Sequence, residues 1–209
     1  MSFGTGVVPA GRLDVGMGNE IKFNDAEAHG NRGLELHRKG QLEEAVSCYQ
    51  KALRINPNLA GVYNNMGAGL QGLGRMEEAL SSFEMAVKIR PDYVEAFNNM
   101  GNLLQQMGRI DEAVSCYQEV LELKPNLSEA HNNLGNAYLR RGQIAEAISC
   151  YQKALELKPD NAQAYCNLGN VYQVQGRIDQ AIFCYEKAVK LSPDNPEAYN
   201  NMGAALKHC

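Results

Sequence analysis

The polar residues of this 209-residue chain that are best placed to bind a ligand are asparagines with a fixed period of 34 residues, as between Asn31 and Asn65. The row is unbroken and consists of Asn31, Asn65, Asn99, Asn133, Asn167 and Asn201. Asparagine is unfavourable inside a helix because its side chain competes for nearby backbone hydrogen bonds. A carboxamide offers both a donor and an acceptor, which match the N–H and C=O groups of an extended peptide. The row therefore predicts a surface that binds peptide backbone.

Two further sets of asparagines flank this row, one residue before it and three residues after it. The first set is Asn64, Asn98, Asn132 and Asn200, and the second is Asn102, Asn136 and Asn170. We expect these residues to extend the peptide-binding surface. In the alternative interpretation, the row only ties neighbouring helices together or reflects recent duplication of one unit.

Prolines and glycines with the same period show which elements position the asparagines. The prolines are Pro57, Pro91, Pro125, Pro159 and Pro193. One glycine of each repeat, such as Gly108, is placed to end a first helix in the left-handed conformation, and the second helix stops before the proline. Each repeat is thus predicted to be helix, turn, helix, turn, and the chain to be all-α.

The repeats begin at residues 26, 60, 94, 128 and 162, and a half repeat begins at residue 196. This register predicts one array over residues 26–209, made of five complete helix pairs and one extra helix. Residues 1–25 are expected to be a flexible, glycine-containing leader. The leader has no apolar stretch of signal-peptide length, which favours a cytoplasmic location.

The repeats resemble the tetratricopeptide repeat family. The residues that carry this resemblance are Tyr165-x-x-Leu168-Gly169-x-x-Tyr172, Ala181-x-x-x-Tyr185 and Pro193. The resemblance implies a right-handed superhelix whose first helices line a concave surface, with the asparagine row pointing into it. The recurring Asn-Asn-(Leu/Met)-Gly segments look most like the arrays of O-GlcNAc transferase and the plant Spindly protein. That narrower resemblance implies a concave asparagine ladder that binds peptide backbone.

Other kinds of site find little support in the sequence. A net charge of −4 and a pI near 5.6 argue against a nucleic-acid partner, and no apolar run is long enough for membrane insertion. Four cysteines share one repeat position, but successive repeats lie on the order of 10 Å apart, too far to share a metal ion. These are Cys48, Cys116, Cys150 and Cys184. No catalytic constellation, metal site or cofactor is predicted.

The sequence therefore predicts a non-enzymatic protein–protein interaction module that binds extended peptide along a concave, asparagine-lined groove. Two alternatives stay open. One is the substrate-recruiting region of an O-GlcNAc-transferase-like glycosyltransferase whose catalytic domain is absent from this chain. The other is a self-assembling scaffold that associates end to end, because the half repeat keeps the apolar pattern of a core-facing helix at Tyr199, Met202 and Leu206.

Overall fold

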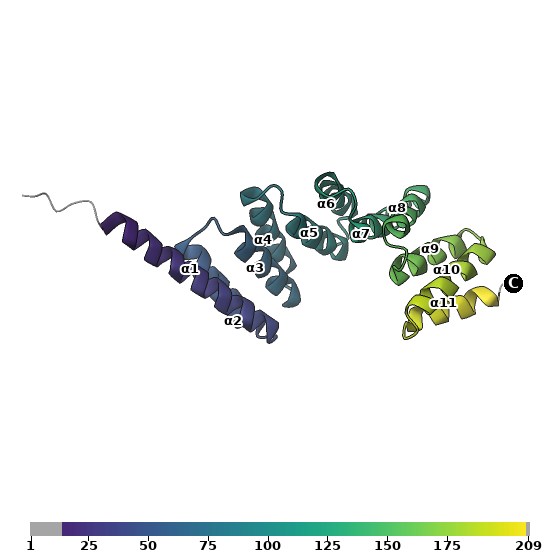
Figure 1. Ribbon diagram of the computed structural model, residues 1–209, viewed down its shortest axis with the longest axis horizontal. Coiled ribbons are helices and arrows are strands. Elements are labelled where there is room, and N and C mark those ends of the chain that lie inside the picture. Colours follow the sequence, from purple (N-terminus) through teal and green to yellow (C-terminus); the bar gives the residue numbers. More distant parts are fainter. Residues whose placement is uncertain (1–13, 208–209) are drawn as a thin grey trace, which may run out of the picture. The chain divides into compact units, whose positions relative to one another are not determined.

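The computed structural model describes residues 14–207 and the side chains of residues 25–207. These residues form eleven α-helices and no strand (Figure 1). The helices are α1 (Asp14–Arg38), α2 (Leu42–Ile55), α3 (Ala60–Gly72), α4 (Met76–Ile89), α5 (Val94–Gln106), α6 (Ile110–Leu123), α7 (Ser128–Arg140), α8 (Ile144–Leu157), α9 (Ala162–Val174), α10 (Ile178–Leu191) and α11 (Pro196–Leu206). The predicted register of five helix pairs followed by one further helix is present.

The chain divides into two compact units. The N-terminal unit ends at Ile89 and contains α1–α4, whereas the C-terminal unit begins at Arg90 and contains α5–α11. Inside each unit, the first helix of a repeat packs on the second helix of that repeat. Each second helix also packs on the first helix of the next repeat in the same unit.

The start of the first helix differs from the expectation of a flexible leader over residues 1–25. Helix α1 begins at Asp14, so residues 14–25 are helical, and residues 1–13 lie outside the described part of the chain. The glycines Gly16 and Gly18 lower helix propensity by about 1 kcal/mol each, but no proline follows Pro9 to interrupt the helix before Ala26.

The turns inside the repeats depend on glycine, as the sequence predicted. Gly40 and its four equivalents have φ between 73° and 81°, the left-handed region in which a side chain is strained. After α1, the N–H of Gln41 donates to the carbonyl oxygen of Leu36 at 3.0 Å, which closes the helix end. The turn thereby reverses the chain and lays α2 against α1.

The crossing point of each helix pair is a glycine against an aromatic ring. A Cβ atom on Gly135 of α7 would lie 2.7 Å from the Tyr151 ring of α8, and one on Gly67 of α3 would lie 2.7 Å from the Phe83 ring of α4. Both aromatic rings are fully buried. No other residue type fits there without displacing the ring, so the glycine sets the distance between the two helices.

Each buried tyrosine hydroxyl at these crossings needs a hydrogen-bond partner. In the C-terminal unit an asparagine of the first helix supplies it. The hydroxyl of Tyr151 donates to Asn136 Oδ1 at 2.7 Å, and that of Tyr185 donates to Asn170 Oδ1 at 2.8 Å. The hydroxyl of Tyr117 donates to Asn102 Oδ1 at 2.6 Å. Three asparagines expected to bind peptide therefore also satisfy buried hydroxyls.

The N-terminal unit lacks this arrangement. Leu34 occupies the asparagine position of the first repeat, and the buried Tyr49 hydroxyl has no hydrogen-bond partner among the described residues. Burial raises the pKa of Tyr49 to about 12, so the hydroxyl keeps its proton at neutral pH. In the second repeat, Phe83 has no hydroxyl and Ala68 stands at the asparagine position, so no hydrogen bond is required.

We expect Tyr49→Phe to raise the free energy of unfolding by about 1 kcal/mol, because it removes a buried polar atom without a partner. The matched change Tyr151→Phe should lower it by about 0.5–1.5 kcal/mol, because it breaks the bond to Asn136. Urea unfolding followed by circular dichroism measures both. The same sign for the two variants would contradict this account of the hydroxyls.

Candidate functional site

The asparagines predicted to bind peptide all lie on first helices. In the N-terminal unit they are Asn31 on α1 and Asn64 and Asn65 on α3. In the C-terminal unit they are Asn98, Asn99 and Asn102 on α5, Asn132, Asn133 and Asn136 on α7, Asn167 and Asn170 on α9, and Asn200 and Asn201 on α11. The repeating helix pairs place them in matching positions within each unit.

In the C-terminal unit, members of the unbroken asparagine row form amide bridges. By this we mean carboxamide hydrogen bonds between neighbouring first helices. Asn133 Nδ2 of α7 donates to Asn98 Oδ1 of α5 at 3.2 Å. Asn167 Nδ2 of α9 donates to Asn132 Oδ1 and Asn136 Oδ1 of α7, both at 3.0 Å. The tie between neighbouring helices that the sequence left as an alternative is therefore present.

The bridges leave part of the carboxamide chemistry unused. Asn133 and Asn201 are half-buried, and their Oδ1 atoms accept no hydrogen bond from a described residue. Asn201 Nδ2 donates to Asn170 Oδ1 at 2.9 Å, which fixes the orientation of the side chain. Because each carboxamide has a donor end and an acceptor end, a bridge at one end holds the other in place without occupying it.

Burial separates the flanking asparagines. Asn64 and Asn132 keep only 8% and 7% of their surface exposed, whereas Asn200 is exposed. The set Asn102, Asn136 and Asn170 is half-buried and accepts from tyrosine hydroxyls. A sequence signal for this second role exists, because each of these asparagines precedes its tyrosine by 15 residues.

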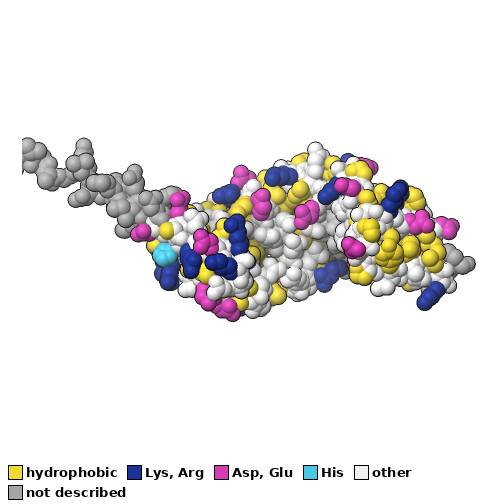
Figure 2. Space-filling view, turned by 60° about the horizontal axis from the view of Figure 1, so that its bottom comes forward, with side chains coloured by type: hydrophobic (Ala, Val, Ile, Leu, Met, Phe, Trp, Pro, Cys, Tyr) yellow, Lys and Arg dark blue, Asp and Glu magenta, His cyan; other side chains and the backbone are white. Residues whose placement is uncertain are grey.

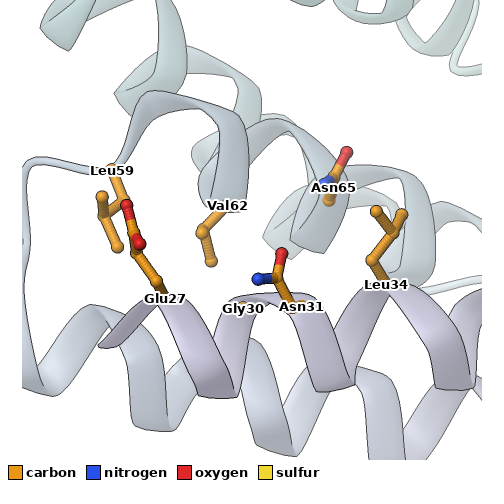
Figure 3. Close-up of a pocket in the computed structure, with 7 residues that line it drawn as sticks. All are labelled: Glu27, Gly30, Asn31, Leu34, Leu59, Val62 and Asn65. Atoms are coloured by element: carbon orange, nitrogen blue, oxygen red, sulfur yellow. The ribbon is translucent and has the colours of Figure 1, made fainter. Parts of the chain in front are cut away.

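The N-terminal unit has a hollow where the C-terminal unit has a bridge. The side chains of Asn31 and Asn65 make no hydrogen bond to each other or to another described residue, and both line a hollow of about 260 Å³ between α1 and α3 (Figure 3). Gly30 and Leu34 stand at the positions held by Asn132 and Asn136 in α7. Neither of these two positions of α1 therefore offers a carboxamide to receive the Asn65 amide.

Carboxylates lie one helical turn before the asparagines on several first helices. Glu27, Glu95, Glu129 and Glu197 are all exposed. Residues four apart share a helix face, so the asparagine-bearing faces of α1, α5, α7 and α11 each carry a carboxylate. Burial is the main cause that raises the pKa of Tyr117 to about 12, and the negative charge of Glu129 adds to the effect.

Two members of the cysteine row, Cys116 and Cys184, do not supply reactive thiols. Cys116 and Cys184 are buried, and burial raises the pKa of the Cys184 thiol to about 11 and that of Cys116 to about 12. Thiols of this kind stay protonated at neutral pH and are poor nucleophiles. Among the described residues, no three His, Cys, Asp or Glu side chains gather as they would around a metal ion. No described helix is long and apolar enough to cross a membrane.

A second hollow, of about 320 Å³, lies beside α9 and α10 and was not predicted from the sequence. Tyr165, Tyr172 and Phe183 line it, and the Phe183 side chain is 55% exposed. Figure 2 shows hydrophobic side chains gathered over this end of the C-terminal unit. A signal existed, because Phe183 interrupts a column of serines: Ser47, Ser81, Ser115 and Ser149.

Comparison with known proteins settles the family. The model of the family described as TPR repeat matches residues 33–74, 72–108, 101–142 and 135–176, and two tetratricopeptide repeat models match residues 162–195 and 184–209. The chain belongs to the tetratricopeptide repeat family. No curated protein matches it significantly. The predicted all-α class of stacked helix pairs is confirmed, and the tetratricopeptide fold supports a role in protein–protein interaction.

Several solved tetratricopeptide repeat structures are similar. The crystal structure of YrrB, described as a TPR protein with an unusual peptide-binding site, has a TM-score of 0.72 and 26% identity, covering 90% of this chain and 97% of YrrB. The crystal structure of MamA has a TM-score of 0.72 and 25% identity, covering 77% of this chain and 94% of MamA. A MamA fragment from Desulfovibrio magneticus RS-1 has a TM-score of 0.75 and 24% identity, with 82% and 97% covered, and shows the fold alone. None of these similarities bears on the narrower resemblance to O-GlcNAc transferase.

We expect Asn167→Ala to lower the free energy of unfolding of this tetratricopeptide repeat chain by about 1–3 kcal/mol. The change removes three side-chain hydrogen bonds, two to α7 and one from Gln163, and leaves the buried Asn132 oxygen without its donor. Asn65→Ala is the matched control, because Asn65 bridges no neighbouring helix and alanine is the better helix former. Urea unfolding compares the two, and an equal loss would mean that the amide bridges contribute nothing.

Proposed function

We propose that this chain is a non-catalytic, cytoplasmic interaction module that binds a partner peptide in extended conformation. The peptide lies on the asparagine-bearing face of the first helices within a unit. The observation that carries the proposal is the amide-bridge pattern of α7, α9 and α11. It holds half-exposed carboxamides in fixed orientations while the Oδ1 atoms of Asn133 and Asn201 accept from no described residue.

Fixed orientation matters because a mobile side chain loses conformational entropy when it binds, whereas a preorganised one does not. Successive first helices place the carboxamides on the order of 10 Å apart, and an extended peptide advances about 3.3 Å per residue. Each carboxamide would thus meet about every third peptide residue. Contacts of this kind go to the peptide backbone, so preference for particular side chains should be weak.

Further support comes from the description of YrrB, which is a tetratricopeptide repeat protein with a peptide-binding site. The cytoplasmic location is supported by the five described cysteines, which are all free thiols. The buried thiols with raised pKa, together with the lack of a metal-like cluster among the described side chains, favour a binding role over catalysis.

The test starts from a peptide selected against the chain from a random library. We expect N-methylation of every third residue, in the register that meets the asparagines, to weaken binding by about 0.5–1.5 kcal/mol per methyl group. N-methylation in the other two registers is the matched control. Fluorescence anisotropy measures the dissociation constants. Equal losses in all three registers, or failure to select any peptide, would overturn the proposal.

The protein side of the same test uses Asn133→Ala combined with Asn201→Ala. The double variant should bind the selected peptide about fivefold to a hundredfold more weakly, provided that its circular dichroism spectrum stays helical. Ser115→Ala combined with Ser149→Ala, at exposed positions of the second helices α6 and α8, serves as the control. Undiminished binding by the asparagine variant would place the peptide on another surface.

Self-association is a second candidate, favoured by α11. Its Tyr199 and Leu206 side chains are 45% and 53% exposed. An apolar helix face of this kind is stabilised when a second copy covers it. Sedimentation velocity over a wide range of concentration should show dimers or longer species that Leu206→Glu abolishes. A wild-type chain that stays monomeric throughout would contradict this candidate.

A further inference from the structure

We propose that the hollow between α1 and α3 is a pocket for a cationic side chain, lysine or arginine, of the bound peptide. This inference rests on the proposed function, because the side chain belongs to a peptide that lies on the same face of the first helices. It adds a point of side-chain recognition to a surface that otherwise contacts backbone. All of the residues that form the pocket belong to the N-terminal unit.

The hollow lies where one amide bridge is missing. In the C-terminal unit, Asn132 and Asn136 of α7 receive the amide of Asn167 and connect α7 to α9. Gly30 and Leu34 occupy the equivalent positions in α1, and Asn65 donates to neither. The space that a bridge would fill is open to a ligand.

The walls of the hollow are aliphatic. Leu34 and Val62 line it from α1 and α3, and Leu59 lines it from the turn before α3 (Figure 3). A Cβ atom on Gly30 would lie 3.2 Å from Val62 Cγ2, so glycine lets the two helices approach closely beneath the opening. The carbon stem of a lysine or arginine packs on walls of this kind while its charged head stays at the polar rim.

The rim carries acceptors without a cation of their own. In Figure 3, Glu27 and Asn31 extend from successive turns of α1 and Asn65 extends from α3, and all three line the hollow. The cation on the same stretch of α1, Arg32, pairs instead with Glu35 at 3.2 Å. No described lysine or arginine lines the hollow. A carboxylate and two carboxamide oxygens can therefore accept hydrogen bonds from an ammonium or guanidinium group.

The chemistry of the rim decides between kinds of ligand side chain. A peptide carboxylate would meet Glu27 and be repelled, and the positive charge needed to hold it is not among the described residues that line the hollow. An aliphatic side chain would fit the walls but would leave the rim acceptors without a new partner. A cation on an aliphatic stem satisfies both parts of the hollow.

The experiment uses a peptide selected against the full chain and synthesised with lysine, norleucine or glutamate at each position in turn. Norleucine keeps the aliphatic stem of lysine and removes the charge. At one position we expect the lysine peptide to bind about threefold to tenfold more tightly than the norleucine peptide, and the glutamate peptide to bind most weakly. Fluorescence anisotropy at low salt measures the three affinities.

Two protein variants locate the effect. Glu27→Gln should abolish the preference for lysine over norleucine, whereas Glu129→Gln, an exposed carboxylate at the same repeat position of α7, should preserve most of it. Gly30→Asn combined with Leu34→Asn should restore the bridge to Asn65, close the hollow and remove the preference. Circular dichroism checks that the variants remain helical.

The outcomes separate this inference from the proposed function. Backbone-dependent binding without a lysine preference, or equal effects of the Glu27 and Glu129 variants, would overturn the pocket and leave the proposed function standing. Failure to obtain any binding peptide would overturn both.

Discussion

In each of the five complete helix pairs, a glycine of the first helix contacts an aromatic ring of the second helix, and the rest of the structure depends on this constraint. At Gly135 and Tyr151 there is no room for even one additional carbon atom. Because this contact fixes the separation of the two helices, every other side chain of the repeat is held at a reproducible position. The rows of polar residues on the first helices follow from that regularity, since the same spacing recurs in each complete pair.

A tyrosine buried at the crossing has a hydroxyl that needs a hydrogen-bond partner, and in the C-terminal unit the first helix supplies that partner. Asn136 illustrates the solution, because its oxygen accepts from both the Tyr151 hydroxyl and the Asn167 amide. Core packing within one repeat is thereby linked to the contact between two repeats. Carboxamides on this face thus contribute to stability, and in the proposed function the same groups bind peptide. A side chain whose hydrogen-bonding groups are all used within the fold has none left for a peptide. Asn167 uses both ends of its carboxamide within the fold. Its amide bridges twice and its oxygen accepts from Gln163.

Periodicity made most of the architecture predictable. The turn glycines, the prolines that follow the second helices and the buried aromatic column recur with one period, so the helix pairs and their register could be read directly. The start of α1 could not be predicted in this way, because the residues before Ala26 belong to no repeat. Whether they are helical depends only on their helix propensities, in which favourable and unfavourable contributions are of similar size. The sequence also could not show which asparagines bridge helices and which accept from tyrosine hydroxyls. The choice of hydrogen-bond partner depends on differences in distance of a few tenths of an ångström. Both hollows coincide with departures from the repeat columns, at Gly30, Leu34 and Phe183, but a departure alone does not tell whether neighbouring side chains fill the space it leaves.

The amide bridges have a consequence for how such an array can be rearranged. The Tyr151–Asn136 bond lies within one repeat, so it travels intact if that repeat is moved or copied. The bonds from Asn167 cross a repeat boundary and need a carboxamide on the first helix of the preceding repeat. A repeat like the third or fourth can precede any bridging neighbour, whereas the first repeat, with Gly30 and Leu34, cannot. The order of the repeats in this chain is therefore constrained by which repeat precedes which. Exchanging repeats would remove amide bridges wherever a bridging asparagine lost its acceptor on the preceding repeat.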